Sequence, residues 1–190
     1  FSDGTYTPEE LIARAKKAGL SGIAVVDHDT ISGIRPVLDA AGKGDIEVLA
    51  GIELTAEYQG LEIHILGYLI DYENKALGGQ LEVLKKIRIE RIHKIADKLK
   101  GMGMELDPES VFVLSQGGTV GRLHVARAMV KEGLVKSSFE AFNKFIGDKC
   151  PAYVLGFKLS PRQAIKLIKD AGGIPVLAHP YTLNRGDLIP

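Results

Sequence analysis

The 190-residue sequence predicts an α/β protein built on a parallel sheet. Helices that carry capping signals alternate with short apolar runs, and this alternation is typical of strands joined by crossover helices. Polar residues follow the apolar runs directly, as expected where buried parallel strands end. A composition of 45% hydrophobic and 25% charged residues matches an ordinary globular protein and excludes extensive disorder.

The first expected helix begins after Thr7. Thr7 suits the N-cap, Pro8 suits the first helical position, and Glu10 stands where the acidic residue of a capping box belongs. Gly19 is placed to end this helix. The apolar run from Gly22 to Val26 then predicts a buried strand.

The same pattern returns along the chain. We expect a helix from Ile34 to Ala41, and strands from Glu47 to Leu54 and from Leu61 to Ile70. A second capping box begins at Ser160 and starts another helix, and the strand after that helix covers Ile174 to Ala178.

The middle of the chain lacks strand signals. Leucine and isoleucine at helical spacing predict one long amphipathic helix from Gly79 to Lys100. Shorter helices are expected from Asp107 to Leu114, from Gly121 to Lys131 and from Ser138 to Ile146. The middle is therefore interpreted as a helical insertion in the α/β domain.

The predicted domain organisation also divides the charge. Residues 1–71, the first part of the α/β domain, contain five basic and twelve acidic residues, whereas the insertion, residues 72–159, contains fifteen basic and ten acidic residues. The α/β domain resumes in residues 160–190, with its C-terminal part missing. The whole chain is neutral, which excludes a strongly basic nucleic-acid binder at the level of the whole chain.

Cysteine content and hydropathy limit the class of protein further. The single cysteine, Cys150, excludes an internal disulfide framework and a Cys-rich zinc module. No apolar run approaches the roughly 18–20 residues that a membrane span needs, and no signal peptide is recognisable. We expect a cytoplasmic protein with no membrane partner and no obligate protein partner.

Five residues stand where strand ends and turns would bring them together. His28 and His179 follow predicted strands, Glu53 is near the end of one, His64 lies inside another, and Asp3 occupies a turn before the first helix. Imidazole and carboxylate groups without thiolates suit Mn²⁺, Fe²⁺ or Zn²⁺. Such ions make a nucleophile of water and clamp the oxygens of a phosphoryl group.

Structural roles are the alternative for each of these residues. A histidine at a strand end is commonly a satisfied polar residue. Asp29 suits a cap for the next helix, and Asp27 suits a hydrogen bond to the backbone.

Five motifs in order resemble the PHP (polymerase and histidinol phosphatase) superfamily, and most closely its stand-alone TrpH-like nucleotide-phosphoesterase branch. They are Ser2-Asp3-Gly4-Thr5 with Thr7-Pro8-Glu9-Glu10, Val26-Asp27-His28-Asp29-Thr30, Gly51-Ile52-Glu53, Glu62-Ile63-His64-Ile65-Leu66-Gly67 and Ala178-His179-Pro180. Together these motifs extend over nearly the whole chain.

The resemblance implies a distorted (β/α)7 barrel with a helical insertion that faces the substrate. It implies that two or three divalent ions, manganese with zinc or iron as alternatives, are held by Asp3, His28, Glu53, His64 and His179. His179 is then also a candidate general acid, and Asp27 a residue that orients a ligand or carries a proton. The implied activity is hydrolysis of nucleotide phosphate, notably of nucleoside 3′,5′-bisphosphates, and trimming of short RNA from its 5′ end.

The sequence departs from the family pattern at both ends. The family's His-x-His pair would precede Phe1, and a later Asp-x-His would follow Pro190. Val26 also stands where the family has threonine. We therefore interpret the chain as part of a longer protein, and we expect these 190 residues by themselves to bind metal poorly and to have weak activity.

Arg122 and His124 stand near the start of an expected helix of the insertion. A helix N-terminus with an arginine favours anions, and the resembling branch has a similar motif, so we assign both residues to substrate phosphate or sugar. The alternative is that such arginines are solvated helix charges.

Two other functions of the protein stay open. One is a histidinol-phosphate phosphatase, and the other is a non-catalytic PHP module that binds nucleic acid.

Overall fold

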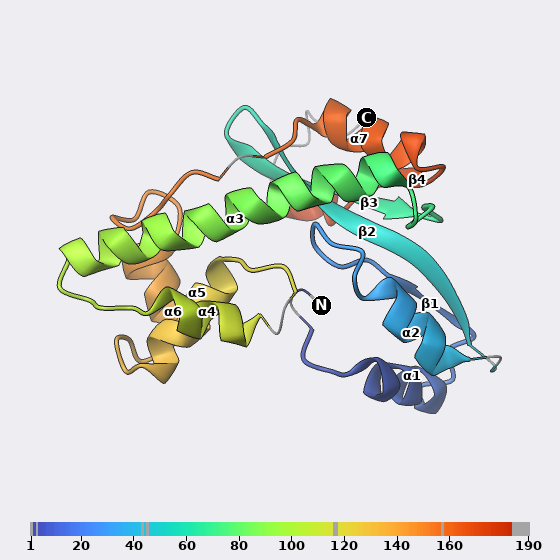
Figure 1. Ribbon diagram of the computed structural model, residues 1–190, viewed down its shortest axis with the longest axis horizontal. Coiled ribbons are helices and arrows are strands. Elements are labelled where there is room, and N and C mark those ends of the chain that lie inside the picture. The colour runs from blue at the N-terminus through green and yellow to red at the C-terminus, as the bar shows by residue number, and fades with distance from the viewer. Residues whose placement is uncertain are drawn as a thin grey trace. The chain divides into compact units, whose positions relative to one another are not determined.

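The computed structural model describes residues 2, 4–42, 44, 46–115, 118–156 and 158–183. The chain forms two compact units (Figure 1). The sheet unit comprises residues 3–82 and 158–190, and the helical unit comprises residues 83–157 with the first two residues.

Four strands form the sheet in the order β1 (Gly22–Val25), β2 (Glu47–Tyr58), β3 (Leu61–Tyr68) and β4 (Ile174–Leu177). β1 pairs with β2 in parallel, but β2–β3 and β3–β4 are antiparallel. The predicted parallel sheet is therefore wrong beyond the β1–β2 pair. The β2–β3 pair is antiparallel because only two residues, Gln59 and Gly60, connect the strands. Both have positive φ, which makes a tight hairpin turn. The mixed α/β class is confirmed, and the seven-stranded barrel stays a prediction.

Helices α1 (Pro8–Lys17), α2 (Ile34–Ala41) and α7 (Pro161–Asp170) belong to the sheet unit. Both predicted capping boxes are present, at Thr7 and at Ser160. In Figure 1, α1 and α2 lie side by side, and α7 packs against β2, β3 and β4. A short 3₁₀ turn (Pro180–Leu183) follows β4.

The strand β2 lies between β1 and β3 and pairs with them over different parts of its length. Its first four residues pair with β1, and the rest, from Gly51 onward, pair with β3. A Cβ atom at Gly51 would lie 2.7 Å from the carbonyl oxygen of Gly67 and 3.0 Å from that of Val25. Only glycine fits where the neighbouring backbones approach this closely.

Helix α3 (Lys75–Gly101) begins four residues before the predicted start. The side chain of Asn74 accepts hydrogen bonds from the backbone N–H groups of Ala76 and Leu77, and Leu77 is fully buried. The cap and the burial of Leu77 stabilise the first turn, so the helix includes Gly78 and Gly79 although glycine disfavours helix.

The helical unit contains most of α3 with α4 (Pro108–Leu114), α5 (Arg122–Lys131) and α6 (Ser138–Ala141). The helix predicted from Ser138 to Ile146 instead continues from α6 into a π turn over Phe142–Ile146. The N–H of Gly147 donates to the carbonyl of Phe142, five residues earlier, and a Cβ at this position would collide with that oxygen. Among the helices of the described residues, none combines the length and apolarity of a bilayer span.

Substituting Gly51→Ala tests the close approach at the centre of β2. Because the added methyl group meets backbone atoms that cannot rotate away, we expect the free energy of unfolding to fall by about 1–3 kcal/mol. Urea denaturation measures this change. The matched control is Gly79→Ala on α3, where a Cβ meets nothing within 4 Å and alanine should stabilise the helix by about 0.5–1 kcal/mol. Equal effects at the two sites would contradict the assignment.

Candidate metal centre

Three side chains converge at one place on the sheet because β2 lies between the other two elements. Glu53 is on β2, His64 is on β3, and His28 follows β1. The β1–β2 pairing continues past the end of β1: the N–H of Glu53 donates to the carbonyl of Asp27 at 3.0 Å, and the N–H of Asp29 donates to the carbonyl of Glu53 at 2.9 Å. This backbone ladder fixes His28 beside Glu53.

Asp29 secures the same loop from inside the protein. Its buried carboxylate accepts a hydrogen bond of 2.8 Å from the backbone N–H of Thr55, and its φ of 50° is in the left-handed region. Helix α2 begins at Ile34, with Gly33 at the N-cap position and no side-chain cap. Asp29 is therefore not the helix cap that the sequence suggested; it ties the His28 loop to β2.

Glu53 stands among three imidazole rings. Its Oε1 lies 3.0 Å from His64 Nδ1 and 3.3 Å from His179 Nε2, and these two nitrogens are 3.1 Å apart. Its other oxygen, Oε2, lies 3.7 Å from His28 Nε2. The two carboxylate oxygens thus face different histidines, an arrangement suited to a carboxylate shared between two ions.

Hydrogen bonds on the outer side of the rings determine which nitrogens face inward. His64 Nε2 lies 3.2 Å from a carboxylate oxygen of Glu62, which only accepts, so Nε2 carries a proton. The hydroxyl of Thr182 donates to the carbonyl of His179 and therefore accepts from Nδ1 of the same ring, at 3.1 Å. His64 Nδ1 and His179 Nε2 are then the inward ligand atoms, on opposite nitrogens of their rings.

Without a metal ion, the charged carboxylates and imidazoles of the cluster stabilise one another. Burial alone would raise the pKa of Glu53, but the hydrogen bond from His64 and the charge of His28 lower it. Burial alone would lower the pKa of His64, but its hydrogen bonds to Glu53 and Glu62 outweigh burial and raise that pKa to about 9. The hydrogen bond from His64, helped by Lys158, holds the pKa of Glu62 well below its usual range.

The donor set fits a divalent ion. Candidate ligand atoms of His28, Glu53 and His64 all lie within 4.8 Å of one another. Tetrahedral ligands at about 2.1 Å from one ion are about 3.4 Å apart, and the separations of 3.0–3.3 Å among Glu53, His64 and His179 are close to this value. Nitrogen and oxygen donors without sulfur suit manganese, iron or zinc.

Comparison with known proteins places this geometry in a family. Residues 1–76, which contain His28, Glu53 and His64, match the PHP domain family. This part of the chain belongs to the PHP domain family. A 5′-3′ exoribonuclease of Haemophilus influenzae is 35% identical over 183 residues, or 96% of this chain and 66% of that protein. A 3′,5′-nucleoside bisphosphate phosphatase of Chromobacterium violaceum is 31% identical over 97% of this chain and 65% of that protein.

A solved structure agrees with these relatives. A candidate metal-dependent phosphoesterase from Bifidobacterium adolescentis superposes with a TM-score of 0.86 at 30% identity, over 94% of this chain and 63% of that one. The PHP chain described here thus spans slightly less than two thirds of the length of the relatives that it matches.

The other site residues predicted from the sequence are Asp3, Asp27, Arg122 and His124. Asp3 lies outside the described residues. The backbone of Asp27 belongs to the ladder that fixes His28, and a catalytic role for its carboxylate stays a prediction. Arg122 and His124 are at the start of α5, in the helical unit.

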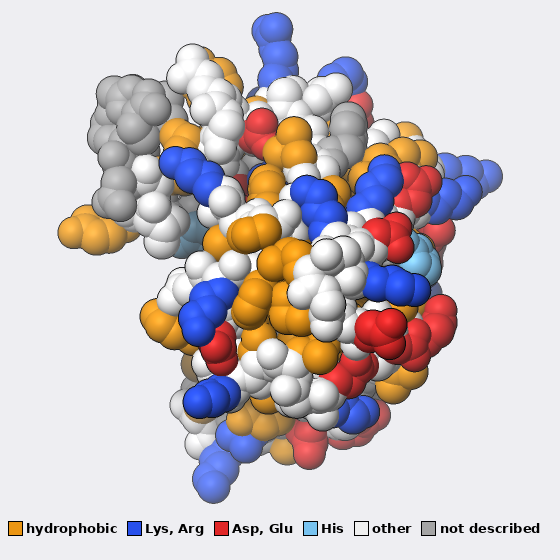
Figure 2. All heavy atoms as spheres, turned by 90° about the vertical axis from the view of Figure 1, so that its left-hand side faces the viewer, with side chains coloured by type: hydrophobic (Ala, Val, Ile, Leu, Met, Phe, Trp, Pro, Cys, Tyr) orange, Lys and Arg blue, Asp and Glu red, His pale blue; other side chains and the backbone are white. Residues whose placement is uncertain are grey.

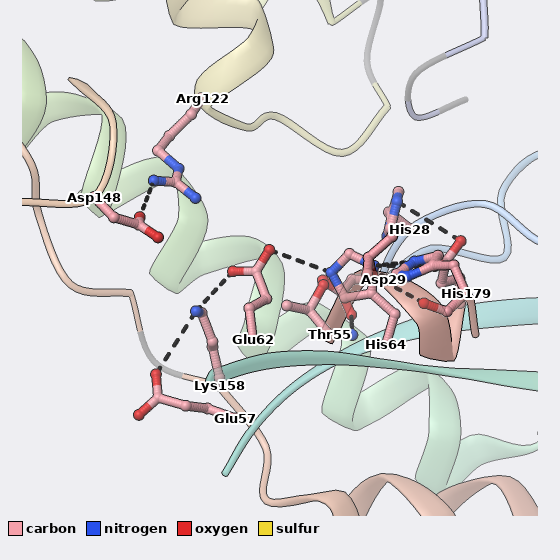
Figure 3. A network of polar contacts seen from close by, with 12 residues as sticks. His28, Asp29, Thr55, Glu57, Glu62, His64, Arg122, Asp148, Lys158 and His179 are labelled. Carbon is pink, nitrogen blue, oxygen red and sulfur yellow. Dashed lines mark hydrogen bonds and ion pairs between the residues drawn. The ribbon is translucent and has the colours of Figure 1, made fainter. Parts of the chain in front are cut away.

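The sequence did not single out Glu62, Lys158 or Thr182 as site residues. For Glu62 a signal existed, because strand alternation places it on the same face as His64. Thr182 is in the 3₁₀ turn that follows β4, and the sequence does not show that its hydroxyl reaches back to His179. Lys158 is far from every motif in sequence, and only the fold brings it to Glu62 (Figure 3).

The raised pKa of His64 predicts how the stability of the metal-free PHP domain depends on pH. Protonated His64 stabilises the fold fully below pH 6.5, its ordinary pKa, and this contribution is lost as the pH rises through about 9. The free energy of unfolding should fall by up to about 3 kcal/mol over that range. Urea denaturation of chelator-treated protein at several pH values measures the fall. His64→Gln should flatten this alkaline limb, and an unchanged slope in the variant would contradict the assignment.

Proposed function

We propose that this protein is a metal-dependent phosphoesterase that releases phosphate from nucleotides. The observation that supports this most directly is the meeting of Glu53 with three imidazoles. In two of these rings the outer nitrogen is engaged by Glu62 or Thr182, so that the inward nitrogen faces the carboxylate and would face a bound ion. A protein that used these histidines only to satisfy a buried glutamate would not need three of them around one carboxylate.

The substrate class follows from the relatives. One is named a 3′,5′-nucleoside bisphosphate phosphatase and another a 5′-3′ exoribonuclease, and both align with nearly the whole chain. We assign to this protein nucleoside 3′,5′-bisphosphates as substrates, with trimming of short RNA from the 5′ end as a second reaction on the same site. Both reactions hydrolyse a phosphorus–oxygen bond next to a ribose: the first releases inorganic phosphate and the second releases a mononucleotide, so one hydrolytic site can serve both.

The roles of the residues follow from their positions. His28, Glu53, His64 and His179, together with Asp3, would hold two or three divalent ions, manganese in the first place and zinc or iron as alternatives. Such ions supply a nucleophile from water at neutral pH and neutralise phosphoryl oxygens. His179 is more exposed than His64, and it is also assigned as a proton donor to the leaving group. Asp27 is assigned either to orienting a histidine ligand or to carrying a proton.

Arg122 is assigned to a substrate phosphate. Its guanidinium bonds to Asp148 Oδ1 at 2.7 Å and lies over the rings of Phe142 and Tyr153, 5.9 and 5.4 Å from their centroids. Asp148 is 73% exposed, so a phosphate can replace it as the partner.

His124 is only 2% exposed, and its Nδ1 accepts a hydrogen bond from the N–H of Gly121. We therefore assign His124 to holding the start of α5 in place.

Surface charge agrees with a local rather than a general attraction to phosphate. On the face shown in Figure 2, lysine and arginine side chains are interspersed with aspartate and glutamate. A single-sign basic surface, which a non-catalytic module would use to bind a nucleic-acid backbone, is not seen on that face.

Metal removal tests the proposed function. Treatment of the intact protein with a chelator should abolish phosphate release from adenosine 3′,5′-bisphosphate, and Mn²⁺ should restore it. Glu53→Gln should lower the activity more than about 100-fold, because a ligand change costs at least as much as a change behind the ligands. The matched control is Glu47→Gln, an exposed glutamate of the same strand.

Three results would each redirect the assignment. Full activity in the chelator would overturn the metal-dependent mechanism. Faster hydrolysis of histidinol phosphate than of the bisphosphate would replace the substrate class. Salt-sensitive RNA binding that is indifferent to chelation, without hydrolysis, would support the non-catalytic module instead.

Arg122→Met tests the phosphate assignment. Loss of a charged hydrogen bond, worth about 1.5–3 kcal/mol, should lower kcat/KM for the bisphosphate about 10- to 100-fold. Steady-state kinetics measure the effect, with the exposed Lys131→Met at the other end of α5 as the control for charge alone. An unchanged kcat/KM in Arg122→Met would show that this arginine is a solvated helix charge.

A further inference from the structure

Lys158 is a buried cation between two glutamates of neighbouring strands. Its Nζ lies 2.7 Å from Glu62 Oε2 and 3.6 Å from Glu57 Oε2, and its side chain is only 9% exposed (Figure 3). Lysine is rarely buried to this extent unless it is paired. The site described above gives this lysine no task, because its ion pairs within the described part of the chain are with Glu62 and Glu57, which are not candidate ligands.

The backbone brings Lys158 to this position. Glu57 and Glu62 are direct cross-strand partners in the β2–β3 hairpin, and like charges in such a pair destabilise a sheet. On the other side of β2, Leu159 forms a parallel bridge with Ala56, and the N–H of Glu57 donates to the carbonyl of Leu159 at 2.8 Å. This bridge fixes the backbone at Leu159, next to Lys158, and thereby places the ammonium group beside the two carboxylates.

Glu62 connects the lysine to the metal centre. One of its oxygens accepts from Lys158 and the other accepts from His64 Nε2 at 3.2 Å. On the opposite side of the same ring, His64 Nδ1 faces Glu53 at 3.0 Å. Without the lysine, Glu62 would lose the contact that holds its second oxygen and would face the charge of Glu57 alone. The carboxylate would then be free to turn away from His64.

We propose that Lys158 is a positioning residue of the metal centre: through Glu62 it holds His64 with Nε2 protonated and Nδ1 available to the ion. The inference rests on the proposed metal site and deepens it. It assigns a carboxylate–histidine pair behind one ligand, and behind that pair a lysine that keeps the carboxylate in one orientation.

The test measures metal affinity rather than activity. The dissociation constant of Mn²⁺ is determined on the intact protein by electron paramagnetic resonance of the free ion. Lys158→Met should raise it about tenfold, the lower end of the effect of groups behind metal ligands. Lys158→Arg keeps the charge and should stay within about threefold of the wild type. The control, Lys166→Met, removes a lysine whose ion pair with Asp170 is exposed on α7, and should change nothing.

A double-mutant cycle shows whether the lysine acts through Glu62. Glu62→Gln should itself weaken Mn²⁺ binding about 10- to 100-fold, and adding Lys158→Met to it should have no further effect. An equal loss in both backgrounds would overturn the inference, as would a wild-type dissociation constant in Lys158→Met. If Lys158→Met does not fold, Lys158→Gln replaces it in the same cycle.

A second pair separates positioning from simple charge balance. Glu57→Gln removes the opposing charge, so the double variant Glu57→Gln/Lys158→Met should regain stability in urea while its Mn²⁺ affinity stays low. Recovery of affinity together with stability would mean that Lys158 only relieves repulsion, and the inference would fall.

Failure of this inference is distinguishable from failure of the proposed function. Mn²⁺ binding without phosphate release from any substrate would overturn the function and leave the affinity test intact. Absence of Mn²⁺ binding in every variant, the wild type included, would overturn the metal centre and the role of Lys158 with it.

Discussion

The carboxylate of Glu53 is the interaction on which the candidate site depends. Its side chain is 14% exposed, and a carboxylate so poorly hydrated needs compensating partners. Three histidines provide them, two at one oxygen and one at the other. In the metal-free protein these partners lower the pKa of Glu53, and the same atoms are at separations that suit ligands of divalent ions. One arrangement therefore serves both the folded state and metal binding.

Strand β2 makes this arrangement possible because it has a neighbour on each of its two edges. Its first part pairs with β1, which leads to His28, and its second part pairs with β3, which carries His64. Gly51 lies where the backbones on both sides approach too closely for a side chain. Glu53 follows two residues later and is bonded through its backbone to Asp27 and Asp29 on one edge while it pairs with β3 on the other, so it meets both neighbours.

A chain of ion pairs with alternating sign extends from Glu53 to Glu57. Glu53 contacts His64, His64 contacts Glu62, and Glu62 contacts Lys158, which also contacts Glu57. Each charged group is paired with the opposite sign in a partly buried place, where an unpaired charge would be costly. The excess of acidic residues in the first 71 positions thus includes carboxylates with specific partners, rather than a uniformly repelling surface.

The sequence by itself determined the α/β class, both capping boxes and the PHP motifs that contain His28, Glu53 and His64, because these signals are local or occur in a fixed order. Tertiary structure alone decided the antiparallel pairing of β3, the role of Asp29 toward Thr55 and the place of Lys158 behind Glu62. The periodicity of the sequence shows which face of a strand is apolar, but it does not show which other strand is the partner or in which direction that partner runs. A contact between residues nearly a hundred positions apart exists only once the chain has folded.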